Sequence, residues 1–337
     1  MGECEAIFFD KRGFAIGDLV ATFDRRWNKN AYGEAKFVAT QSDVAARAGQ
    51  FESGNFLLLR EADLPDWVGY LDTPESWGAG KVTFTAFSAE RLFDQRPGVV
   101  DKLYGTGGSI FERVIEMAND LGDTLIRPGE IFAGGNSREE SFSPANQLYK
   151  DIDRIARRSR NDWDVTPSYT NGKLVLEANW YERKRKRIPF ALTEGYNMEL
   201  KENTLEYEGR VWNYVVAYGN ASTWSSRVTH EVWDDESIKK HGLRVTGLAV
   251  QSNEEATVQA AAEAHLAINK ERRRKLDVSV TDVDGTFRQL RIGHVPDVEV
   301  MQQGIENGEV GFTAEMEIIE MIYDHAAGKI DVTLKEY

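Results

Sequence analysis

The chain has 337 residues, of which 41% are hydrophobic and 28% are charged. It carries 55 acidic and 41 basic residues, which gives a formal net charge of −14 at pH 7. This balance argues against a protein whose main surface binds nucleic-acid phosphates, because such binding depends on Lys and Arg side chains. No run approaches the roughly 20 apolar residues of a membrane span, so no membrane anchor is expected.

The N-terminal segment gives no targeting signal. It lacks a basic start followed by a long apolar region, so we predict no secretory signal and expect synthesis in the cytoplasm. The single cysteine, Cys4, excludes an internal disulfide framework and any Cys-rich zinc site. Folding is therefore expected to depend on packing alone.

Residues 1–100 are predicted to form an antiparallel β domain. Four segments alternate apolar and polar residues between Gly, Pro and Asn, as half-buried strands do: 35–41, 55–61, 67–73 and 81–89. In the last of these, the valine and both phenylalanines are expected on one face, largely opposite the threonines. One short helix is predicted at 43–49, with Ser42 as its cap and Gly49 as its stop.

Residues 101–202 are predicted to form a small α/β domain. Ser109 and Glu112 have the spacing of a capping box, and apolar residues follow at helical spacing until Gly122. A second helix is expected to open at residues 143–144, a Ser-Pro pair.

Two loops have the composition of hairpin turns. Asn171 and Gly172 form the strongest two-residue turn signal, between two segments of strand character. The loop at 324–329 separates two alternating segments near the end of the chain. Both loops predict antiparallel strand pairs.

Residues 203–337 are predicted to form a second β domain with an inserted helical segment at about 234–272. A strand at 209–220 opens it. Inside the insert, a short helix is expected to end at Gly242 and a long one to be capped by Asn253. The long helix carries one stripe: Val258, Ala261, Ala262, His265 and Ile268. Further strands are predicted at 275–282, 287–293, 297–302, 309–324 and 328–337. The predicted fold class is thus α+β and β-rich.

The candidate chemical motifs favour structural interpretations. Gly105–Ser109 could hold an anion at a helix start, but it lacks the Gly-Lys-Ser/Thr of a phosphate loop. Asp282–Gly285 resembles the opening of a calcium loop without its later ligands, which favours a hairpin turn. No serine lies in G-x-S-x-G, and five histidines are scattered without metal-ligand spacing: His230, His241, His265, His294 and His325. The sequence therefore predicts no catalytic, cofactor-binding or metal site, and no enzyme.

The strongest local charge feature is the basic run Glu182–Arg187. Contact with nucleic acid is one interpretation, but the run lacks the aromatic platform of an RNA reader. A solvated strand end, or a patch that meets an acidic neighbouring subunit, is favoured instead.

Three stretches, taken in order, carry a resemblance to a known family: Trp67–Arg96, Ala145–Leu176 and Glu206–Asn220. A short charged helix and an alanine-rich helix follow them. In the order of these segments and in their residue patterns, the chain resembles the hub proteins of tailed bacteriophages. These comprise the baseplate hub of contractile tails and the N-terminal region of tail-associated lysins in long non-contractile tails.

The resemblance implies a ring, usually trimeric, in which two tail-tube-like β-barrel domains per subunit mimic the sixfold tail tube. Such a hub would sit at the tail tip of the virion. It would join the tube or a distal tail protein to a central fibre or spike, with a tape-measure protein as a further partner. DNA would contact it only in passage through the lumen. The strand at 209–220 would belong to the second barrel, and no catalytic residue transfers to this chain.

The alternative interpretation is a β-rich carbohydrate-binding module or a glycan-processing enzyme. Its sugar groove would be lined by tryptophans: Trp163, Trp180, Trp212, Trp224 and Trp233. Tryptophans in alternating strands are more often core or interface residues. The hub interpretation is therefore favoured.

Overall fold

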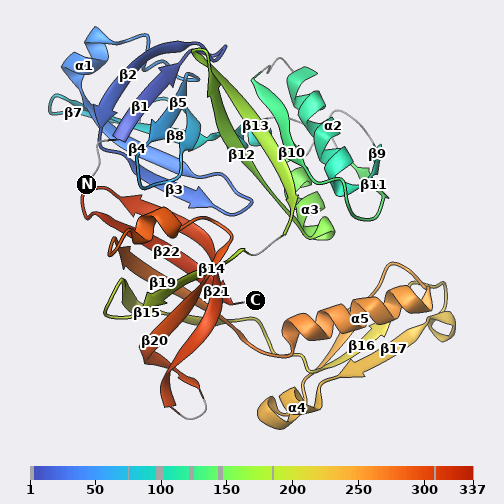
Figure 1. The fold of residues 1–337 in the computed structure, drawn as a ribbon. Coiled ribbons are helices and arrows are strands. Elements are labelled where there is room, and N and C mark those ends of the chain that lie inside the picture. The colour runs from blue at the N-terminus through green and yellow to red at the C-terminus, as the bar shows by residue number, and fades with distance from the viewer. Residues whose placement is uncertain are drawn as a thin grey trace. The chain divides into compact units, whose positions relative to one another are not determined.

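A computed structural model describes residues 4–74, 76–95, 102–120, 125–142, 147–183, 186–306 and 309–336. The chain divides into two compact units, which Figure 1 colours along the sequence. The larger unit comprises Met1–Lys201 and Val278–Leu334, and the smaller comprises Glu202–Asp277 and Lys335–Tyr337. The predicted α+β, β-rich fold class is confirmed.

The first β region of the larger unit is built from antiparallel pairs, as the alternating residues predict. In spatial order its strands are β3 (Asp24–Asn28), β4 (Glu34–Thr40), β8 (Lys81–Ser88), β6 (Trp67–Leu71), β5 (Phe56–Arg60), β1 (Cys4–Phe9) and β2 (Ala15–Ala21). A short strand, β7 (Ser76–Gly78), pairs with β8. The four predicted strands are confirmed, whereas β1, β2 and β3 carried no clear signal.

Strand β8 buries a different set of residues from the one predicted. Val82, Phe84 and Ala86 are buried in the same core cluster. Phe87 packs against the other core cluster of the unit. The expectation that both phenylalanines share a face is wrong, because Phe84 and Phe87 are three residues apart and a strand alternates with a period of two.

The short helix α1 (Gln41–Ala46) starts earlier than predicted. Its cap is Thr40, whose hydroxyl accepts a hydrogen bond from the backbone N–H of Asp43 at 3.1 Å. The cap predicted at Ser42 is therefore wrong, because the last residue of β4 already supplies the oxygen that the first turn needs. The helix ends before Arg47, so Gly49 does not stop it.

The middle of the larger unit packs two helices against a three-stranded sheet (Figure 1). The helices are α2 (Gly107–Asp120) and α3 (Leu148–Ser159). The sheet order is β10 (Ile126–Ile131), β13 (Lys173–Glu182) and β12 (Asn161–Thr170), and β9 (Lys102–Gly105) pairs separately with β11 (Arg138–Ser141). The expected helix end at Gly122 and helix start at 143–144 lie outside the described residues.

Local signals in this region are partly confirmed. The hairpin at Asn171 and Gly172 joins β12 to β13, and both turn residues have positive φ, 54° and 76°, as a type I′ turn requires. Helix α2 is confirmed, but it begins two residues before Ser109. The hydroxyl of Thr106 accepts from the N–H of Ser109 at 3.3 Å, so Thr106 and not Ser109 caps the helix.

Strands from the second half of the chain extend the first β region. Strand β21 (Glu309–Asp324) pairs with β3, and the sheet continues through β22 (Lys329–Glu336), β19 (Arg273–Thr281) and β15 (Met198–Glu208). Strand β20 (His294–Glu306) pairs with β21 and, in parallel, with β14 (Lys186–Thr193). The β21–β22 hairpin is confirmed. The strand predicted at 287–293 is wrong, because Thr286–Gln289 form a 3-10 helix, η3.

The smaller unit holds a separate three-stranded sheet of β17 (Thr229–Trp233), β16 (Tyr214–Tyr218) and β18 (Val245–Ala249). The strand expected at 209–220 is therefore part of this sheet and not of the long one, which corrects its assignment to a second barrel. Val215 and Ala217 of β16 pack against Val258 and Ala262 of α5 (Glu255–Asn269). One face of β16 is thus covered by α5, a helix of the same unit.

Helix ends in the smaller unit follow the predictions in part. Helix α4 (Asp235–His241) is capped by Asp234 and ends at Gly242 with φ 74°, as predicted. Asn253 does not cap α5. Its side-chain oxygen instead accepts from the N–H of Val228 at 2.9 Å. Ile268, predicted on the apolar stripe, is exposed.

Candidate functional site

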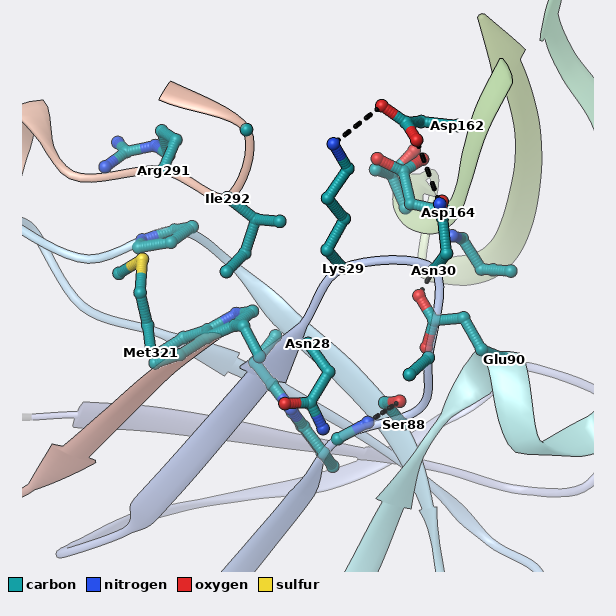
Figure 2. Close-up of a pocket in the computed structure, with 18 of the residues that line it drawn as sticks. Asn28, Lys29, Asn30, Ser88, Glu90, Asp162, Asp164, Arg291, Ile292 and Met321 are labelled. Atoms are coloured by element: carbon teal, nitrogen blue, oxygen red, sulfur yellow. Dashed lines mark hydrogen bonds and ion pairs between the residues drawn. The ribbon is translucent and has the colours of Figure 1, made fainter. Parts of the chain in front are cut away.

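A cavity of about 330 Å³ lies within the larger unit. Its walls come from the end of β3 and the following turn, the start of β6, strand β12 and the turn that precedes β20. Figure 2 shows Lys29 and Asp162 joined across it, with Arg291 and Ile292 on the other side of the view. Residues far apart in the sequence therefore meet here.

Strand β12 supplies the acidic wall. Trp163 and Val165 point into the core, so the alternation of the strand places Asp162 and Asp164 on the opposite face, toward the cavity. Asp162 accepts hydrogen bonds from Asn30 at 2.9 Å and from Arg183 at 3.0 Å. Its other oxygen lies 3.1 Å from Nζ of Lys29. Both carboxylate oxygens of Asp162 are thus occupied by donors from the same chain.

Asp164 is held by neutral donors. It accepts from Nδ2 of Asn179 at 2.9 Å and from the hydroxyl of Tyr181 at 2.7 Å. Burial raises the pKa of Asp164 above its ordinary value, although both hydrogen bonds oppose this shift. Burial and the neighbouring Asp164 raise the pKa of the Tyr181 hydroxyl, which stays protonated as the donor.

Glu90 is an acid whose surroundings disfavour its ionised form. It lies in the first turn of the 3-10 helix η1 (Ala89–Gln95), and its Oε1 accepts from the backbone N–H of Val165 at 3.0 Å. Burial raises its pKa to about 7, with hydrogen bonds from Ser88 and Val165 opposing the shift. Glu90 thus joins η1 to β12 while carrying a charge that its surroundings disfavour.

Replacing Glu90 by Gln is expected to change the pH dependence of stability. The native pKa is raised, so the native state binds the extra proton between pH 4.5 and about 7, and wild-type stability falls across that window. Because one pKa unit corresponds to about 1.4 kcal/mol, E90Q should gain up to about 3 kcal/mol over wild type above pH 7. Urea unfolding at pH 4.5, 6 and 8 measures the difference, with exposed E112Q as the control. An equal pH profile for E90Q and wild type would contradict the prediction.

The cavity offers charge binding, and the Ser88 hydroxyl meets the Glu90 carboxylate at its wall. Its acids are occupied by donors from the same chain. The thiol of Cys4 lies elsewhere, buried in β1, and burial raises its pKa to about 11, so it remains a neutral thiol near pH 7. Within the described part of the chain, no group of three or more His, Cys, Asp or Glu could hold a metal ion.

The motifs singled out from the sequence have structural roles. Gly108 of the Gly105–Ser109 segment lies so close to Phe132 that a Cβ would stand 2.2 Å from its carbonyl oxygen, so glycine permits the contact of α2 with that segment. In Asp282–Gly285, the Asp282 carboxylate accepts from the N–H of Phe287 at 3.0 Å. This segment leads into η3 and is not the predicted hairpin turn.

Two of the five tryptophans of the alternative interpretation cannot line a groove. Trp163 and Trp180 are buried in the core of the larger unit. Trp224 and Trp233 are exposed and belong to the smaller unit. A sugar groove lined by the buried pair is therefore wrong.

The basic run is largely paired within the chain at the positions that the structure describes. Arg183 contacts Asp162, and Arg187 lies 2.9 Å from Glu315 and 3.4 Å from Asp297. Residues 184–185 lie outside the described residues. Lys186 lines the cavity.

No protein-family model matches the sequence. No curated protein matches it either. Among the described residues, no helix is both long enough and apolar enough to cross a membrane.

Solved structures of tail proteins share the fold over nearly the whole chain. The 43 kDa tail protein of prophage MuSo2 from Shewanella oneidensis matches with a TM-score of 0.62 and 12% identity, over 99% of this chain and 98% of that one. Prophage tail protein gp18 from Listeria monocytogenes matches with 0.60 and 10% identity, over 99% and 94%. A tail protein from Neisseria meningitidis matches with 0.59 and 12% identity, over 99% and 97%. The resemblance to phage tail proteins is thereby confirmed at the level of the fold.

Proposed function

We propose that this protein is a structural component of a phage tail, acting as the hub of the tail tip or baseplate. The observation that carries the proposal is the end-to-end likeness to three tail proteins, each covered over at least 94% of its length. A likeness of this extent spans nearly the whole chain and is not limited to one module. The saturated acids of the cavity support a structural role and not catalysis.

The proposed assembly is a homotrimeric ring with two tail-tube-like β-barrel domains per subunit. The proposed domains are 1–100, 101–202 and 203–337. In the described part of the chain, the long sheet is an open path from β15 to β2, so a barrel wall would need additional contacts from neighbouring subunits. We propose that the ring joins the tail tube or a distal tail protein to a central fibre or spike, next to the tape-measure protein.

The net charge of −14 fits passage of DNA through such a ring. A weakly repulsive wall avoids the Lys and Arg contacts that would retain phosphates. DNA is therefore proposed as a passing cargo and not as a ligand, at the tail tip of a virion assembled in the host cytoplasm.

The test is the mass of the purified protein in native mass spectrometry, with imaging of the particles by electron microscopy. A ring of about 114 kDa, three times the 38.0 kDa chain, is expected. Salt and protein concentration are varied as controls for nonspecific association. A chain that stays monomeric throughout and binds glycans would overturn the hub proposal in favour of a carbohydrate-binding module.

A further inference from the structure

Three basic groups gather at the wall of the cavity where β20 begins. Residues Arg291 to His294 form a β-turn, in which the N–H of His294 donates to the carbonyl of Arg291 at 3.1 Å. Gly293 has φ +82°, the left-handed conformation that the third position of a type II turn requires. The turn therefore brings Arg291 and His294 close together.

Strand pairing adds the third group. In the parallel pairing of β14 with β20, Lys186 is the register partner of His294. Register partners on adjacent strands project to the same side of a sheet. Burial lowers the pKa of His294, and the nearby charges of Lys186 and Arg291 act in the same direction, so the neutral ring is favoured.

Arrangements of like charge are unfavourable unless a counter-charge is present. Every carboxylate that lines the cavity already has a donor: Asp66 has Arg60, Asp162 has Lys29, Asp164 has Tyr181 and Glu90 has the N–H of Val165. By contrast, Lys186, Arg291 and His294 form no ion pair with a carboxylate within the described ranges. The cavity thus has an unbalanced positive wall.

The side-chain nitrogens that these groups do not use within the chain indicate which kind of ligand the wall would bind. His294 Nδ1 lies 2.7 Å from the carbonyl of Gln289, which only accepts, so Nδ1 carries the proton of that bond, and Nε2 becomes a donor only when the ring is protonated. Arg291 uses Nη1 on the carbonyl of Leu290 at 2.6 Å, which leaves further N–H groups of its guanidinium.

Beside the acidic wall on β12, the cavity also has apolar lining. The indole rings of Trp27 and Trp67 and the side chain of Met321 line the cavity together with Ile292. A volume of about 330 Å³ is at the lower end of the range of small-molecule pockets. The site therefore has room for an apolar body beside an anionic group.

We propose that this cavity binds a small oxyanion ligand, a phosphate or carboxylate carried on an apolar or aromatic body, with Lys186 and Arg291 holding the anionic group. This ligand site is additional to the proposed hub function. Charge-assisted hydrogen bonds from Lys186 and Arg291 supply the affinity, and the aromatic wall favours a flat body.

The test is isothermal titration calorimetry of the purified full chain with phenyl phosphate, phenylacetate and benzyl alcohol. At least one of the two anions should bind, and the neutral alcohol should bind at least about tenfold more weakly than that anion. Comparing the two anions distinguishes a phosphate from a carboxylate ligand. No binding of either anion at millimolar concentration, or equal binding of the alcohol, would overturn the proposal.

Variants locate the site. K186Q and R291Q should each weaken anion binding by about tenfold or more, because each removes one charge-assisted hydrogen bond. R187Q is the matched control, because Arg187 neighbours Lys186 in the sequence but pairs with Glu315, and its affinity should stay within about twofold of wild type. Lys186 is exposed, so K186Q should fold even if R291Q does not. Equal affinity of K186Q and wild type would refute the assignment.

Discussion

Replacing Arg25 by Met is expected to destabilise the larger unit by about 3–5 kcal/mol, because it leaves a buried carboxylate without its partner. Arg25 lies on β3, its side chain is fully buried, and it forms an ion pair with Glu61, which is also nearly buried. The hydroxyl of Tyr323 lies 3.5 Å from Glu61, and the Tyr323 ring lies 5.5 Å from the Arg25 guanidinium. Arg25 thus sits where β3 joins the first and last β regions.

The adjacent residue is the control for this prediction. Arg26 on the same strand pairs with Glu320 at 3.0 Å, but its side chain is 39% exposed, so R26M should cost only about 0–1 kcal/mol. The double variant R25M/E61L should recover most of the lost stability, because it removes both buried charges. Urea unfolding followed by tryptophan fluorescence measures all three variants. Similar losses of stability for R25M and R26M would show that the buried ion pair stabilises the protein no more than the exposed one.

Replacing Trp180 by Ala is expected to destabilise the larger unit by about 3–5 kcal/mol, the range for removing a large aromatic side chain from a packed core. Trp180 on β13 has no exposed surface. Its ring centroid lies 4.9 Å from that of Phe111 on α2, so the side chain holds helix and sheet together. The remaining space cannot collapse, because Trp163 and Phe111 are fixed by their own neighbours.

Trp224 supplies the matched control for the core substitution. It is 67% exposed, so W224A should change stability by no more than about 0.5 kcal/mol. W180F should lose less than W180A, because the smaller ring keeps part of the contact with Phe111. Thermal unfolding by circular dichroism gives the comparison. Equal stability of W180A and W224A would mean that the α/β core does not depend on this ring.

The cavity shows why its site was not predicted from sequence. His294 was noted among scattered histidines, and Lys186 among the residues of a basic run. Their proximity depends on the parallel register of β14 and β20, which joins segments more than 100 positions apart. Nothing local encodes that register. The available signal was only Gly293, a glycine suited to a turn just before a strand.

The sequence by itself determined the local elements of this protein. Alternation at 35–41 and 81–89 marks strands because the strand period is two, and Asn171-Gly172 marks a hairpin because both residues tolerate positive φ. The absence of the catalytic motifs considered above also follows from the spacing of residues along the chain. These properties depend on neighbours within a few residues, so they can be read along the chain.

Only the tertiary structure decided which elements meet. The pairing of Arg25 with Tyr323 joins strands from opposite ends of the chain, and β16 lies in its own sheet although its residues suit any half-buried strand. Caps also shifted to Thr40 and Thr106, because the chain entering each helix fixes which hydroxyl reaches the free N–H groups. Such choices depend on long-range packing energy, which is shared among distant residues and leaves no local pattern in the sequence.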